Sequence, residues 1–240
     1  MNDLDLITKL KNKFKVEKEE ILNKQRAETK RLLATLPPER LVYLSPRQYQ
    51  GAQKMAEGRY NSNRLNGVFH PNLDGKEIAH LDKPWEERDL VGALGEVIAL
   101  NWLHSNFEYL KTFENSFTQM TDYSPRSSRQ GTDDGDLWIT LPNGERLSID
   151  VKCTTYDKNT SIPAWKKGDL NIDIIMRVSL IDKENGIGFI QGFIKADKSY
   201  QPQFWNKNAA TPCWSIPHSQ LTTDFPYFIS SNFHSSIQLH

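Results

Sequence analysis

The sequence is poor in cysteine, has no excess of charge of either sign and lacks a long apolar run. Cys153 and Cys213 are the two cysteines among 240 residues, too few for a disulfide framework, which suits a reducing compartment. Lysine and arginine together number 30, and so do aspartate and glutamate, so any nucleic-acid-binding surface must be local. No stretch is apolar enough to span a membrane, and the first residues do not read as a signal peptide. We therefore expect a cytoplasmic protein without a membrane segment.

Motifs for nucleotide cofactors are absent as well. The sequence has neither a P-loop nor a dinucleotide-binding fingerprint, so no nucleotide cofactor is expected. The six histidines show no metal-ligand spacing. The length suits one domain with a good core and an appended element.

The stretch from Asp136 to Lys152 predicts a β-hairpin. Apolar residues alternate with polar ones in both halves: Leu137, Ile139, Leu141, then Leu147, Ile149, Val151. Pro142-Asn143-Gly144 lies between the two halves and has the composition of a three-residue loop that ends in a left-handed glycine.

This loop length fixes the register of the hairpin. Leu141 then pairs with Glu145, and Asp136 lies opposite Asp150. A two-residue loop would put the two apolar sets on opposite faces, which a half-buried hairpin does not tolerate. The predicted register gathers Asp136, Asp150 and Lys152 on one face, and carboxylate oxygens of this kind suit magnesium or manganese.

The simpler alternative is a charged strand face that points into solvent. Two features favour a site instead. Asp133 and Asp134 concentrate acidic residues just before the first strand, and the strand runs among apolar segments, where an isolated charge is costly.

An apolar helix is expected from about Pro84 to His104, and it carries a glutamate within its apolar surface. Gly92 and Gly95 lie one turn apart and would permit a close approach to a sheet. Glu96 must therefore be paired, protonated or bound to a metal.

These residues together resemble the PD-(D/E)XK nuclease superfamily, whose fold is that of restriction endonucleases. Asp136 followed by Asp150-Val151-Lys152 is similar to the family motif, and Glu96 is similar to the glutamate that the family places on an upstream helix. The resemblance covers roughly residues 85 to 195. The chain departs from the pattern at Gly135, where the motif has a proline that many family members also lack.

The resemblance implies an α/β fold, with a mixed central sheet flanked by helices, and a magnesium-dependent deoxyribonuclease. Asp136, Asp150 and the Val151 carbonyl would bind Mg²⁺, for which Mn²⁺ could substitute. Lys152 would orient the attacking water or stabilise the transition state, and Glu96 would support the metal. A restriction-type or phage DNA-processing endonuclease is the first expectation. The alternatives are an exonuclease, a structure-specific nuclease, and an inactive DNA-binding or assembly protein of the same fold.

Several basic residues are candidates for contacts with DNA. A helix is expected to begin at Ser45-Pro46, capped by Ser45 with Gln48 at the capping-box position. A solvated helix face explains its basic residues equally well. The full candidate set includes this helix, the segment that follows it and two polar loops: Arg47, Lys54, Arg59, Arg64, Arg126, Arg129, Lys166 and Lys167.

The remaining elements complete the predicted organisation. A charged helix is expected from residue 3 to about 35, either packed on the core or pairing two copies into a homodimer. Further strands are expected at 107–118, 174–180 and 187–194, and the tail from Asp197 reads as a wrapped extension. We therefore divide the chain into an N-terminal helical extension, residues 1–82, and a nuclease core with a C-terminal wrap, residues 83–240.

Overall fold

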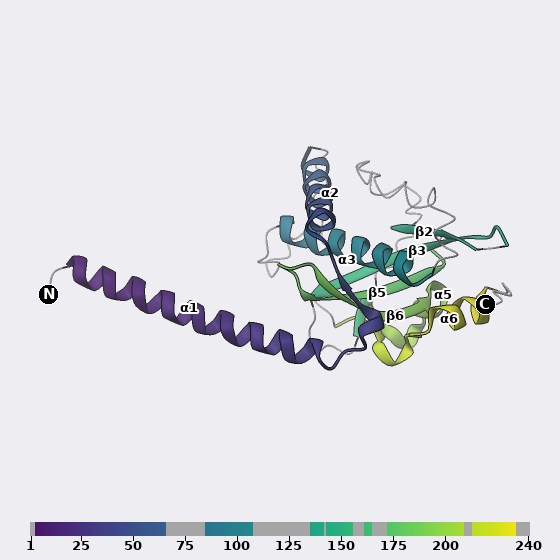
Figure 1. Cartoon of the computed structure of the whole chain (residues 1–240). Helices are drawn as coiled ribbons and strands as arrows, with labels where there is room; N and C mark the ends of the chain where they lie inside the picture. Colours follow the sequence, from purple (N-terminus) through teal and green to yellow (C-terminus); the bar gives the residue numbers. More distant parts are fainter. Residues whose placement is uncertain are drawn as a thin grey trace. The chain divides into compact units, whose positions relative to one another are not determined.

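The computed structural model describes most of the chain, with gaps (Figure 1). The described ranges are 3–65, 85–107, 135–141, 143–155, 161–164, 172–208 and 213–233. Contacts divide the chain into two compact units, Met1–Glu39 and Arg40–His240. Each unit is described by itself.

The first unit is one helix, α1, Asp3–Leu33. Lys30 and Arg31 lie in its last turn, where positive charge suits the helix dipole. The backbone N–H and the hydroxyl of Thr35 both donate to the Leu32 carbonyl, at 2.9 and 2.8 Å, and so satisfy one of the last carbonyls. The predicted helix is confirmed.

The second unit is built on a five-stranded mixed sheet in the order β1-β6-β5-β3-β2. β3 and β5 are parallel, and the other neighbouring pairs are antiparallel. The strands are β1 Leu41–Tyr43, β2 Leu137–Thr140, β3 Arg146–Thr155, β5 Ile174–Asp182 and β6 Ile187–Lys195. The fold is therefore mixed α/β, as expected at that level of description.

A second, three-stranded sheet has the order β4-β8-β7 and was not predicted. It joins β4, Ser161–Ala164, to strands of the C-terminal tail, β7 Trp205–Asn206 and β8 Cys213–Pro217. The tail is thus part of the second unit. Its remaining short elements are α5 Ala196–Ser199, η4 Pro202–Phe204, η5 His218–Gln220 and α6 Phe225–Asn232.

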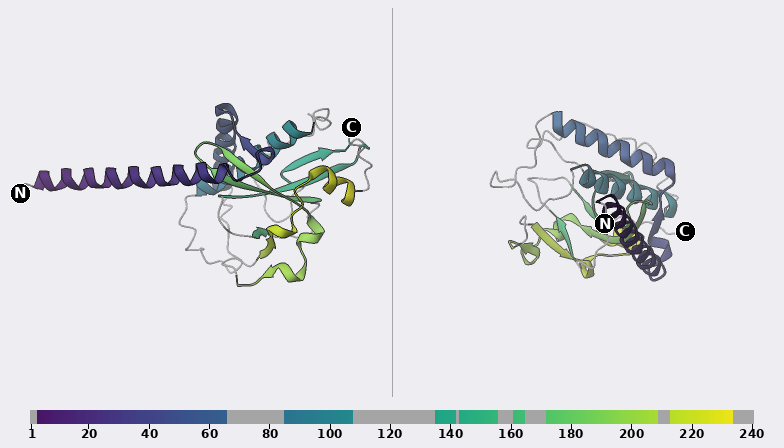
Figure 2. Two further views of the ribbon diagram at one scale, coloured as in Figure 1. Left: turned by 60° about the horizontal axis from the view of Figure 1, so that its bottom comes forward. Right: turned by 90° about the vertical axis from the view of Figure 1, so that its left-hand side faces the viewer.

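One long helix, α3, Trp85–Asn106, covers one face of the main sheet, and a second, α2, Pro46–Leu65, packs on α3. α3 lies between α2 and the sheet in the right-hand view of Figure 2. The predicted capping box opens α2: Ser45 N–H donates to Gln48 Oε1 at 2.8 Å, and Gln48 N–H donates to Ser45 Oγ at 3.3 Å. After η1, Pro38–Arg40, strand β1 joins the main sheet.

The contacts divide the chain after Glu39, earlier than the predicted boundary at residue 82. β1 pairs with β6, and α2 buries Ala52, Met55 and Ala56 in the core, so residues 40–65 are built into the second unit. The strand predicted at 107–118 lies outside the described residues except for Phe107, which is buried.

The two faces of the main sheet have different cores. Ile149, Val151 and Met176 belong to the larger core, together with Leu94 and Ile98 of α3. On the other face, the smaller core joins residues of both sheets and the segment after β6: Ile175, Ile194, Ala196 and Ile216. Within the part of the chain that the structure describes, no helix is long and apolar enough to cross a membrane.

Glycine sets the distance between α3 and β3. A Cβ on Gly95 would lie 2.3 Å from Cβ of Cys153, whereas a Cβ on Gly92 would meet nothing within 4 Å. The predicted close approach to the sheet is therefore confirmed for Gly95 and wrong for Gly92. This contact fixes the position of the next residue, Glu96, above β3.

Candidate active site

The hairpin has the predicted register. Leu137 pairs with Ile149 and Thr140 with Arg146, and Leu141 N–H donates to the Glu145 carbonyl at 2.7 Å. Gly144 has φ +84°, as the left-handed end of the loop requires. The six apolar side chains of the predicted inner face are all buried.

Asp136 lies at the end of the hairpin ladder and is hydrogen-bonded to the residues on either side of Asp150. Its backbone N–H donates to the Ile149 carbonyl at 2.8 Å, and its Oδ2 accepts the Val151 N–H at 2.8 Å. Asp136 is thus tied to the residue before and the residue after Asp150. Gly135 has φ +94°, and a Cβ there would lie 3.0 Å from the Ile149 carbonyl oxygen, so this position requires glycine.

Asp150 and Lys152 form an ion pair on the same face of β3. Lys152 Nζ lies 2.5 Å from Asp150 Oδ2, and their side chains are 23% and 12% exposed. Burial by itself would lower the pKa of Lys152, but attraction to Asp150 and then to Asp136 outweighs it and raises that pKa. The predicted grouping of two carboxylates and one lysine is therefore present.

The Val151 carbonyl points to the same side as Asp136. In a strand, the N–H and C=O of one residue point the same way, and the Val151 N–H bonds Asp136. β2 begins only at Leu137, so this carbonyl lies past the end of the ladder. Its direction fits the predicted ligand role.

Tyr200 belongs to the same site and was not predicted. Burial raises its pKa, the Asp150 charge raises it further, and the Lys152 charge partly opposes this. The ring packs against the smaller core and lies edge-on to Trp214, with ring centroids 5.3 Å apart. A lone tyrosine after α5 carries no local signal that would reveal this position.

Glu96 is held by an arginine. Arg59 of α2 donates to both carboxylate oxygens, at 2.7 and 2.6 Å, and Glu96 is only 4% exposed. Of the three states expected for this glutamate, the structure has the paired one. Both oxygens face Arg59, so Glu96 is not arranged here as a metal ligand.

The charge of Asp136 in the hairpin also affects the pKa of Arg59. Burial would lower its pKa, but the hydrogen bonds and charge of Glu96, followed by the charges of Asp136 and Asp89, raise it. The predicted role of Arg59 in DNA contact does not match this inward position. Arg59 is instead ion-paired with Glu96 and lies near enough to Asp136 and Asp89 for their charges to act on it.

Cys153 is partly buried and packs against the larger core. Burial raises the pKa of its thiol to about 12, the positive charge of Arg177 opposes this, and the charge of Glu96 adds to it. Arg177 is buried on β5 and donates to the Thr154 hydroxyl. The thiol is therefore protonated at neutral pH and is not a nucleophile.

The other predicted DNA-contacting residues divide into two groups. Arg47 and Lys54 are exposed on α2, which is compatible with either a DNA contact or a solvated face. Arg64 lies in the last turn of α2. Four lie outside the described residues, as do Asp133 and Asp134: Arg126, Arg129, Lys166 and Lys167.

The donor set can be tested against a divalent cation. Asp136, Asp150 and the Val151 carbonyl supply the oxygen donors that magnesium prefers. Among the described residues, no group of three or more His, Cys, Asp or Glu side chains gathers in one place. Two carboxylates and one carbonyl are fewer ligands than magnesium needs, so water and substrate oxygens would have to complete its shell.

No family model matches the chain, and neither a curated protein nor a solved structure matches it.

Proposed function

We propose that the protein is a metal-dependent DNA nuclease of the PD-(D/E)XK type, which hydrolyses phosphodiester bonds. One observation carries the proposal: Asp136, Asp150 and Lys152 meet where the hairpin ladder ends. Oxygen ligands for a hard cation and a fixed positive charge beside them are what this hydrolysis requires. The mixed sheet with α3 packed on β3 and β5 supports the same class.

Each residue of the site has a distinct task in this proposal. Asp136, Asp150 and the Val151 carbonyl would hold magnesium, which supplies a water of lowered pKa and positive charge at the phosphate. Lys152 would leave Asp150 for a phosphate oxygen or the attacking water, where its charge stabilises the transition state. Tyr200, on which the charges of Asp150 and Lys152 act, would limit the access of water to Lys152.

Glu96 acts as a positioning residue in this mechanism. Through its two hydrogen bonds it holds Arg59, and the Arg59 charge lies near Asp136. Glu96 would therefore act on the site through the placement of Arg59 and not as a metal ligand.

The runner-up is a DNA-binding or assembly protein of the same fold without activity. It is favoured by the engagement of Glu96 with Arg59 and by the two-carboxylate donor set among the described residues. Within the nuclease class, an exonuclease and a structure-specific nuclease fit the same geometry.

Cleavage assays on several forms of DNA test the proposal. Supercoiled, linear and branched DNA are incubated with the protein in magnesium, in manganese and in EDTA, beside Asp150→Asn, which keeps the size of the side chain and removes its charge. We expect cleavage in both metals, none in EDTA and none by the variant. Nicking of the supercoiled circle identifies an endonuclease, loss of only linear DNA an exonuclease, and selective cutting of branches a structure-specific enzyme. DNA binding in calcium with no cleavage in magnesium or manganese would overturn the proposal in favour of the binding protein.

A further inference from the structure

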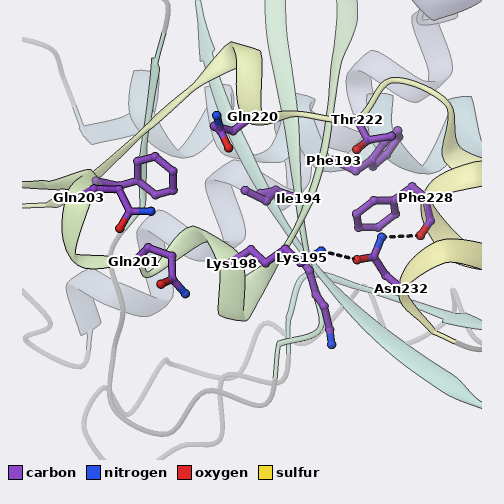
Figure 3. A pocket seen from close by; sticks show the side chains of 11 residues that line it. Phe193, Ile194, Lys195, Lys198, Gln201, Gln203, Gln220, Thr222, Phe228 and Asn232 are labelled. Carbon is purple, nitrogen blue, oxygen red and sulfur yellow. Dashed lines mark hydrogen bonds between the residues drawn. The ribbon is translucent and has the colours of Figure 1, made fainter.

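A polar groove of about 430 Å³ lies at the C-terminal end of strand β6 (Figure 3). β6 is next to the edge of the main sheet, and β1 pairs only with its first residues, Ile187 to Phe189. The groove lies along the last residues of β6, Phe193 to Lys195, where Thr222 pairs with Phe193 in place of β1. η4, η5 and α6 contribute its other walls.

The lining combines amide groups with positive charge. Four carboxamide side chains line the groove: Gln201, Gln203, Gln220 and Asn232. Lys195 and Lys198 also line it, and none of the described lining residues is acidic. Lys195 Nζ lies 3.5 Å from Asp197, outside the lining, so Lys198 is the principal cation.

Lys198 is exposed and directed along the groove. Its Nζ donates to Asn232 Oδ1 at 2.9 Å, and Asn232 Nδ2 donates to the Phe228 carbonyl at 2.8 Å. Figure 3 shows this chain of bonds on one side of the groove, with Gln201 and Gln203 on the other. An ammonium group and several carboxamides therefore face one space.

The groove is close to the candidate active site. Asp150 pairs with Ile175, and Ile175 pairs with Ile194, so the three residues form one row on one face of the sheet. Two strand spacings separate Asp150 from Ile194, about 10 Å. Tyr200 packs against the smaller core that contains Ile194 and lies near Asp150 and Lys152. The smaller core, with Tyr200 packed against it, therefore lies between the groove and the site.

We propose that this groove binds one unpaired nucleotide of the nucleic-acid substrate. Ammonium groups bind phosphate, and glutamine carboxamides such as those of Gln203 and Gln220 form paired hydrogen bonds with base edges. Asn232 instead holds Lys198, and Gln201 donates to the Asp197 carbonyl. The half-buried Phe204 offers a ring on which a base can stack. The volume suits a small ligand, not a duplex. The inference deepens the proposed function, since it rests on nucleic acid being the substrate.

Binding of oligonucleotides to the full chain tests the inference. The probes are a labelled single-stranded oligonucleotide and the blunt duplex of the same sequence, measured by fluorescence anisotropy in calcium at several salt concentrations. Lys198→Gln is expected to weaken single-strand binding about fivefold or more and to reduce the salt slope by about 0.7, the value for one lost phosphate contact. Gln203→Ala is expected to weaken the same binding without changing the slope.

Lys183→Gln is the matched control, because Lys183 lies before β6, in the turn at the end opposite Lys195. It should bind both probes as the wild type does. Thermal unfolding of each variant checks that the fold is intact. Because Lys198 is exposed, we expect its substitution to leave the fold unchanged. A free deoxynucleoside monophosphate is added as competitor, and displacement of the strand only at millimolar concentration supports a site for a nucleotide within a strand.

Three results would overturn the inference: equal binding by Lys198→Gln and Lys183→Gln, absence of single-strand binding by the wild type, and displacement by the free nucleotide at concentrations as low as those of the strand. Each leaves the nuclease proposal to be decided by plasmid cleavage. If the wild-type protein cleaves no DNA but its single-strand binding is lost in Lys198→Gln, the groove proposal is supported and the nuclease proposal is refuted.

Discussion

Lys152 is the residue on which the chemistry of the site depends most directly. It is mostly buried, lies 2.5 Å from Asp150 and is near enough to Asp136 for that charge to raise its pKa. The two aspartates are ligand candidates, whereas Lys152 carries no metal. Substitutions at these positions should therefore separate metal binding from catalysis.

Alanine at either Asp136 or Asp150 should weaken magnesium binding and abolish cleavage together. Lys152→Ala should leave metal binding intact or tighten it, because a cation beside the site is removed. It should still lower cleavage by about two orders of magnitude, or about 3 kcal/mol of transition-state stabilisation. Calorimetric metal titration beside plasmid cleavage measures both effects, with Lys183→Ala as a control that changes neither. Full cleavage by Lys152→Ala would contradict the role of Lys152 in stabilising the transition state.

The pair formed by Arg59 and Glu96 makes a second residue-level prediction, about stability. Arg59→Met leaves a carboxylate buried without its partner and should cost about 3–5 kcal/mol of unfolding free energy. Adding Glu96→Leu to the same protein should recover part of this loss, since no buried charge then remains. Urea unfolding measures the difference.

Lys54→Met is the control for this pair, because it removes a charge from an exposed position of the same helix. It should change the unfolding free energy by less than about 0.5 kcal/mol. An Arg59→Met cost no larger than that of Lys54→Met would show that the ion pair does not stabilise the fold. Glu96→Gln addresses its function: unchanged magnesium affinity supports the positioning role, and a large loss supports direct ligation.

At the scale of elements, the contact between α3 and β3 decides where Glu96 lies. Gly95→Ala places a methyl group within 2.3 Å of Cys153 Cβ, an atom that cannot rotate away. The elements must separate, and we expect a loss of about 1–3 kcal/mol in unfolding free energy, typical of an overpacked core. Cleavage should fall as well, because α3 carries Glu96 and through it Arg59.

Gly92→Ala is the matched substitution on the same helix. A Cβ there meets nothing within 4 Å, so alanine should stabilise α3 by up to about 1 kcal/mol through helix propensity. Thermal or urea unfolding compares the two variants. Equal effects of the two substitutions would contradict the close packing of α3 on β3.

At the scale of the whole molecule, the chain divides after Glu39. Both sheets, the candidate site and the groove belong to the second unit. Deletion of residues 1–35 should therefore leave cooperative unfolding, with a midpoint in urea close to that of the full chain.

Light scattering on the same truncated protein measures its mass in solution. Loss of cooperative unfolding would show that α1 belongs to the core. A full chain that is twice the mass of the protomer, with a truncated form at protomer mass, would support the predicted pairing of two copies through α1.

The sequence by itself determined the hairpin register, the capping box of α2, the apolar face of α3 and the grouping of Asp136 with Asp150 and Lys152. Each follows from a local period or a short loop, whose physics is complete within about twenty residues. Only the tertiary structure decided the partner of Glu96, the place of Tyr200, the pairing of β4 with β8, and the groove beside β6. These depend on contacts between segments far apart in the chain. No sequence periodicity predicts the partner of a lone arginine on a polar helix or of a tyrosine after a short turn. The same holds for a strand of two to five residues.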